Sequence, residues 1–74
     1  MMENLRYSVK TLDGEVLAYV GKKVYADDLA ETISLAQKNK IIVVYDREAH
    51  VDVVEFWNGK MEILEKGPRY CDRR

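Results

Sequence analysis

The chain has very few of the residues that cross-link a small fold or interrupt it. Its 74 residues include one cysteine, one proline and four glycines. A single thiol excludes an intramolecular disulfide, and one thiol with one histidine excludes a cysteine-rich zinc site. Hydrophobic residues make up 47% of the sequence, which excludes a disordered chain.

An excess of one charge and a long hydrophobic run are missing as well. The 12 Lys and Arg residues nearly balance 13 Asp and Glu residues, so no strong field attracts a polyanion or an anionic membrane. The longest apolar run, Ile41 to Tyr45, is far too short to span a bilayer, and Met1 to Lys10 lacks the apolar stretch of a signal peptide. We therefore expect a cytoplasmic protein.

The chain is long enough to form one small hydrophobic core. We expect a single domain over residues 1–66 and a C-terminal tail over residues 67–74, beginning at Gly67-Pro68. A domain of this size buries only about 60% of the surface that its unfolded chain exposes, so its stability is marginal unless a second subunit contributes.

The N-terminal third predicts a β-hairpin. Leu5 to Lys10 alternates apolar and polar residues, as a half-buried strand does, and a second strand is expected over Glu15 to Val20. Asp13-Gly14 favours a two-residue type I′ turn between them. That turn would set Lys10 opposite Leu17. One face of the hairpin would then carry Leu5, Tyr7, Val9, Val16, Ala18 and Val20.

A helix is expected next, from Asp27 to Lys38. Asp27 or Asp28 suits its N-cap, and Asn39 suits the left-handed residue that ends many helices. Apolar residues recur at three- and four-residue spacing, which is typical of a helix with one buried face. These residues are Ala26, Leu29, Ala30, Ile33 and Ala36.

The second half of the chain predicts three more strands. Ile41 to Tyr45 is a continuous β-branched run, as found in a central strand whose two faces are both covered. Val51 to Trp57 and Lys60 to Glu65 flank Asn58-Gly59, a strong signal for a type I′ hairpin turn. The order ββαβββ then predicts an α+β fold: a five-stranded, mainly antiparallel sheet in the order 2-1-3-4-5, with the helix packed on one face.

A single helix covers only one face of such a sheet. We expect it to cover the face that bears Tyr7, Val9, Val54 and Phe56, together with Met61 and Ile63. The opposite face would expose Leu12, Leu17, Tyr19, Val53, Trp57 and Leu64. An exposed apolar patch larger than a few hundred Å² generally marks an interface. The alternative is that the tail around Tyr70, or a curl of the sheet, covers this second face.

We therefore predict a non-enzymatic protein-interaction module, a homodimer formed through the open sheet face, with a second protein as a further partner. Its contact residues would be Leu17, Tyr19, Val53, Trp57 and Leu64, and its register would be set by Arg6, Lys10, Glu55 and Glu62. Glu55 opposite Glu62 is an unfavourable like-charge pair that Arg6 and Lys10 of a second copy would relieve. A compact chain of this kind would suit a regulatory or inhibitory adaptor.

Single-stranded nucleic acid is the alternative partner for the same face. Tyr19, Tyr45 and Trp57 would stack bases, while lysines and an arginine beside them would contact phosphates. The near-neutral charge of the chain and the two glutamates in the path of the phosphates oppose this hypothesis.

Two sets of residues could carry chemistry, and the sequence supports neither a metal site nor a catalytic site. Asp46, Glu48, His50 and Asp52 would project to one side of an extended segment and could suit a divalent cation, but polar residues are ordinary in such a connection. The two glutamates lack the water-excluding pocket that acid–base catalysis needs. We predict no catalytic residue, no metal and no cofactor.

Overall fold

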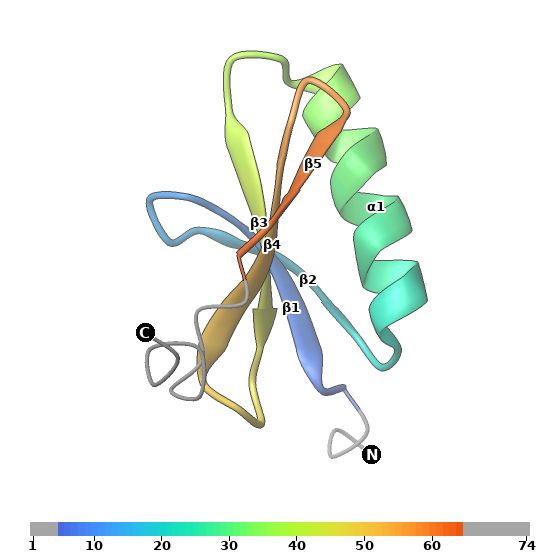
Figure 1. The fold of residues 1–74 in the computed structure, drawn as a ribbon, viewed down its shortest axis with the longest axis vertical. Helices are drawn as coiled ribbons and strands as arrows, with labels where there is room; N and C mark the ends of the chain where they lie inside the picture. Colours follow the sequence, from blue (N-terminus) through green and yellow to red (C-terminus); the bar gives the residue numbers. More distant parts are fainter. Residues whose placement is uncertain (1–4, 65–74) are drawn as a thin grey trace.

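The computed structural model describes residues 5–64, which form a five-stranded antiparallel sheet with one helix along one side of it (Figure 1). The elements are β1 (Tyr7–Thr11), β2 (Val16–Val20), α1 (Lys23–Ala36), β3 (Ile41–Asp46), β4 (Val51–Trp57) and β5 (Lys60–Ile63). The strand order is β2-β1-β3-β4-β5. This confirms the predicted α+β class, the ββαβββ order of elements and the strand order. The predicted tail, with Cys71, and the domain boundary at residue 66 lie outside the described residues.

β3 is the middle strand of the sheet, as its unbroken β-branched sequence predicts. It pairs with β1 on one side and with β4 on the other. Ile42, Val43 and Val44 have no exposed surface. No helix within residues 5–64 is long and apolar enough to cross a membrane.

The core lies between α1 and one face of the sheet. α1 contributes small residues, which allow the helix to approach the sheet closely, while the strands contribute larger ones. The buried cluster consists of Val9, Ala26, Ala30, Ile42, Val44, Val54 and Phe56. This confirms which sheet face the helix covers.

The turn of the first hairpin is wider than predicted. The Thr11 N–H donates to the Glu15 carbonyl at 2.9 Å, so the loop has three residues, 12–14. Among them only Gly14 has a positive φ, +107°, whereas a two-residue type I′ turn needs two such residues. The Thr11 hydroxyl holds the wider loop, because it donates to the Asp13 carboxylate and accepts from the Glu15 N–H.

The wider loop shifts the register of β2. Lys10 pairs with Val16, and Leu17 becomes the extra residue of a β-bulge. The expected pairing of Lys10 with Leu17 is therefore wrong. Val16 consequently shares a sheet face with Lys10, opposite the helix, and not the helix-covered face on which the simple alternation placed it.

The second hairpin has the predicted turn and register. Asn58 and Gly59 have φ values of 54° and 80°, as a type I′ turn requires. Trp57 pairs with Lys60, and Glu55 pairs with Glu62. The local signal decided the register here because both turn positions hold residues that tolerate a positive φ.

A second bulge interrupts β4 on its other side. Val44 pairs with Val54 and Tyr45 with Asp52, which leaves Val53 as the extra residue. Val53 is half-buried and packs against the core cluster. The bulge thus removes Val53 from the open face and puts Asp52 there, in line with Tyr45.

The helix begins one turn earlier than predicted and ends two residues sooner. Its N-cap is Lys22, with no hydrogen bond from the side chain, and it runs over Lys23–Ala36. Asp27 is not a cap because it lies inside the helix, where its carboxylate pairs with Lys23 at 2.9 Å. Asn39 does not adopt the left-handed conformation expected of it.

Ser34 joins the helix to the second hairpin. Its side chain is fully buried, and its hydroxyl accepts a hydrogen bond from the Gly59 N–H at 2.9 Å while donating to the Glu31 carbonyl at 2.8 Å. This contact fixes the β4–β5 turn against the C-terminal half of α1.

Candidate interaction surface

The sheet face opposite α1, which we call the open face, is a mixture of apolar margins and charged positions. The backbone register arranges its residues in three rows across the strands. The first row is Leu12, Ile41, Trp57 and Lys60, the second is Val16, Lys10, Val43, Glu55 and Glu62, and the third is Tyr19, Ser8, Tyr45 and Asp52.

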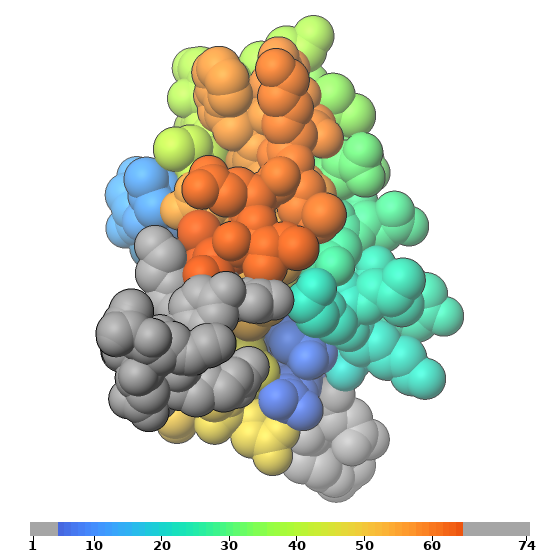
Figure 2. Space-filling model, in the orientation of Figure 1, coloured from blue at the N-terminus to red at the C-terminus, as the bar shows by residue number. Residues whose placement is uncertain are grey.

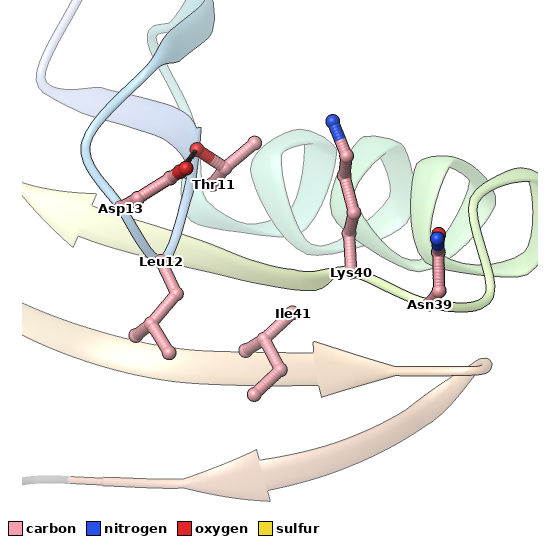
Figure 3. Close-up of a pocket in the computed structure, with 6 residues that line it drawn as sticks. All are labelled: Thr11, Leu12, Asp13, Asn39, Lys40 and Ile41. Carbon is pink, nitrogen blue, oxygen red and sulfur yellow. Dashed lines mark hydrogen bonds between the residues drawn. The ribbon is translucent and has the colours of Figure 1, made fainter.

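Large apolar side chains are exposed along two margins of the open face. In the first row, Leu12 is 57% exposed and Trp57 is 52% exposed, with half-buried Ile41 between them. Leu12 and Ile41 point to the same side of the sheet (Figure 3). Along β2 the exposed residues are Val16, Leu17 and Tyr19. The apolar residue at the centre of the face, by contrast, is buried.

Val43 occupies that centre and has no exposed surface. Its cross-strand neighbours are Lys10 and Glu55, both half-buried. The Lys10 ammonium lies 4.4 Å from the centre of the Tyr45 ring and 3.4 Å from an Asp52 carboxylate oxygen. The charge of Lys10 is therefore already compensated within the chain.

Arg6 is also engaged within the chain, at the β3–β4 connection. Its guanidinium binds both carboxylate oxygens of Asp46, at 2.9 and 2.8 Å, and reaches Glu48 at 3.0 Å. The hydrogen bond from Arg6 lowers the pKa of Asp46, as do backbone N–H donors from Glu48 and Ala49, against an opposing effect of burial. Arg6 and Lys10, predicted to meet glutamates of a second copy, thus have partners of their own.

Glu55 and Glu62 lie opposite each other, as predicted, and neither is compensated in the same way. Within residues 5–64, no ion pair involves either glutamate or Lys60. An open hollow of about 390 Å³ lies over these three residues, Trp57 and Met61. The β4–β5 end of the open face therefore combines negative charge with an exposed indole.

The structure thus gathers some of the predicted contact residues and separates others. Leu17, Tyr19 and Trp57 are exposed at the margins of the open face. Val53 packs against the core, and Leu64 is half-buried after β5, where its N–H donates to the Val53 carbonyl at 2.9 Å.

Val16 was missed as an exposed residue of this face. A three-residue loop that ends in a glycine is a frequent alternative to the two-residue turn, and considering it would have placed Val16 on this face.

The acidic connection between β3 and β4 does not assemble a metal site. It is a turn and not an extended segment, with His50 at a φ of 60° and Asp46 already bound to Arg6. Across the described part of the chain, no three His, Cys, Asp or Glu side chains are arranged to hold a metal ion.

A second hollow, of about 500 Å³, lies between the β1–β2 loop and the α1–β3 connection (Figure 3). Its walls include Leu12, Asp13, Lys40 and Ile41. The hydrogen bond from Thr11 lowers the pKa of Asp13, which makes this carboxylate a poor base. The Lys40 side chain points away from Leu12 and Ile41 (Figure 3). The Thr11 hydroxyl on the same wall donates to the weakly basic Asp13 carboxylate and accepts from the Glu15 N–H, so the walls offer no activated nucleophile.

The fold and this surface define a class: a small α+β domain in which, over residues 5–64, one helix covers one sheet face and the other face, apolar at its margins, has no element packed on it. Comparison with protein-family models gave no match, and comparisons with curated proteins and with solved structures gave none either.

Proposed function

We propose that the chain is a non-enzymatic protein-interaction module of the cytoplasm whose open face binds a second copy of the chain. The observation that carries the proposal is the set of large apolar side chains exposed on the face that α1 leaves uncovered. They are Leu12, Val16, Leu17, Tyr19 and Trp57, with exposed fractions from 37% to 57%. Apolar patches of this kind, rimmed by polar groups, are typical of interfaces.

The residue types on the two margins favour a specific contact. Trp and Tyr often supply most of the binding energy of an interface, because they bury a large area at little cost in conformational entropy. Trp57 and Tyr19 stand at opposite ends of the face, in its first and third rows. A two-fold axis that lies in the plane between two facing sheets, across the line from Trp57 to Tyr19, would bring such unlike ends together, as in the symmetric dimers that are most common among oligomers.

Sedimentation velocity at micromolar concentration tests the proposal. We expect the wild type to sediment as an oligomer and Trp57→Ala and Leu17→Ala to dissociate at least about tenfold more readily, the size of effect that truncation of an anchoring interface side chain produces. Tyr25→Ala is the matched control, since Tyr25 is 61% exposed on α1, in the other layer. It should behave as the wild type does.

Two outcomes would overturn the proposal. One is a wild-type chain that stays monomeric over the whole concentration range. The other is an oligomer that neither Trp57→Ala nor Leu17→Ala weakens. Circular dichroism of each variant separates loss of association from loss of fold.

Nucleic acid is less well supported as the partner. The rings of Tyr45 and Tyr19 are already contacted by cations, Lys10 at 4.4 Å and Arg47 at 4.7 Å, so a stacked base would have to displace them. Glu55 and Glu62 occupy the second row. Titration with a single-stranded oligonucleotide at low salt is the discriminating measurement, because binding that weakens steeply with added salt would favour this alternative.

A further inference from the structure

The outer edge of β5 is a second candidate surface for binding. Since β5 ends the strand order, no strand within residues 5–64 pairs with that edge. Its surface lies beside α1 (Figure 2). An unpaired edge presents backbone donors and acceptors to another strand. In β5 the exposed, charged Lys60 and Glu62 alternate with Met61 and Ile63, which are 54% and 55% exposed.

The backbone groups that face this edge belong to Met61 and Ile63. The Leu64 N–H donates to the Val53 carbonyl of β4, so the backbone groups of Leu64 face β4. Because these groups alternate in direction along an antiparallel strand, those of every second residue also face β4, and those of Met61 and Ile63 point outward. A further antiparallel strand can therefore pair only in registers that set outward-facing residues opposite each other.

We propose that two copies of the chain pair their β5 strands antiparallel, with Met61 of one copy opposite Met61 of the other. Lys60 of each copy is then directly opposite Glu62 of the other. A shift to the next permitted register sets Glu62 opposite Glu62, and a shift the other way sets Lys60 opposite Lys60. Opposite charges facing each other stabilise a strand pair and like charges destabilise it, so one register satisfies both backbone and charge.

The apolar side chains fit the same register. Ile63 of one copy falls opposite Gly59 of the other, which carries no side chain of its own. Gly59 packs against Leu35 of α1, which is 48% exposed, so Ile63 also gains an apolar neighbour. The contact thus covers exposed apolar groups that α1, packed chiefly over β3 and β4, leaves at the edge.

This edge contact goes beyond the proposed function and does not depend on it. It joins two sheets side by side and leaves both open faces uncovered. A chain that makes both the edge contact and the open-face contact forms assemblies larger than a dimer, and Trp57→Ala then retains the edge dimer.

Disulfide trapping in the full chain tests the register. In a Cys71→Ser background, Met61→Cys places two thiols across the two-fold axis, where a Cα separation of about 5.5 Å lies within the range of a disulfide. Ile63→Cys is the control, equally exposed on the same strand but separated from its own copy by about 14 Å along the strands. Mild oxidation should cross-link Met61→Cys at least about tenfold faster than Ile63→Cys, because the distance of the control excludes a bond.

Charge exchange supplies an independent measurement. Glu62→Lys should weaken cross-linking about fivefold or more, as expected when two facing ion pairs become like-charge pairs. Its fold should not suffer, because the same change removes the repulsion between Glu62 and Glu55 within the chain. Adding Lys60→Glu restores the opposite pairs between copies and should restore cross-linking. Equal cross-linking at positions 61 and 63, or no restoration by the double exchange, would overturn the edge contact.

Discussion

At the scale of single residues, Asp46 organises the connection between β3 and β4. Its side chain is only 9% exposed and accepts hydrogen bonds from Arg6 and from the backbone N–H groups of Glu48 and Ala49. One carboxylate thus fixes the β3–β4 turn and holds Arg6 away from the open face.

Asp46→Asn should lower the free energy of unfolding by about 2 kcal/mol, because an amide accepts fewer of these bonds and leaves Arg6 without its main partner. Glu48→Gln is the control. Glu48 is 72% exposed, and a surface ion pair contributes less than about 1 kcal/mol. Urea denaturation at neutral pH measures both, and equal losses in the two variants would contradict this account.

The same carboxylate predicts a pH dependence. The pKa of Asp46 in the folded chain is below its ordinary value of 3.8, so the folded state binds fewer protons there than the unfolded state does. The stabilisation is complete above the ordinary pKa and is lost as the pH falls through the lower folded-state pKa. Urea midpoints of the wild type should therefore fall on the acid side of 3.8, and those of Asp46→Asn should fall less.

At the scale of elements, the second hairpin and α1 are held together at the Asn58-Gly59 turn. Gly59 donates to Ser34 and packs against Leu35, both on α1. A local signal for a turn therefore also decides how closely helix and hairpin approach each other.

Gly59→Ala should destabilise the fold by about 1–3 kcal/mol, through the cost of a positive φ and a forced shift of a neighbour. The added Cβ would lie 2.7 Å from a Leu35 methyl carbon, at a φ of +80°. Leu35→Ala in the same chain should recover the steric part and leave the backbone part. Gly14→Ala reports backbone strain alone, since nothing lies within 4 Å of that position. Additive effects of Gly59→Ala and Leu35→Ala in chemical denaturation would contradict the steric account.

At the scale of the whole molecule, the proposed association would be coupled to stability. A domain of this size buries a modest share of its surface, so a contact between copies adds noticeably to its stability. Exposed apolar groups at the open face and at the β5 edge are the places where that addition can arise.

The thermal midpoint of the wild type should therefore rise with protein concentration. Binding at about one hundred times the dissociation constant adds roughly 2.7 kcal/mol to stability. Trp57→Ala should show a weaker dependence, and Tyr25→Ala should match the wild type. Differential scanning calorimetry over a wide concentration range measures this, and a constant wild-type midpoint would contradict the coupling.

The parts of the fold that depend on local pattern could be predicted. The β-branched run of β3 predicted a central strand, the spacing around Ala26 and Ala30 predicted the helix face, and Asn58-Gly59 predicted a turn with its register. Each property is set within a few residues, by periodicity or by tolerance of a positive φ. The start of α1 was not predicted because Asp27 serves an ion pair inside the helix.

The sequence by itself determined the number, kind and order of the elements, because burial of one apolar face per element leaves few arrangements. Tertiary structure alone decided which residues reach the open face. The bulges at Leu17 and Val53 arise from pairing between distant strands, and one bulge exposes Val16 while the other turns Val53 toward the core. Arg6 likewise pairs with Asp46 only because the fold brings together two segments that are forty positions apart in the sequence. Such choices depend on distances in space, which no local pattern specifies.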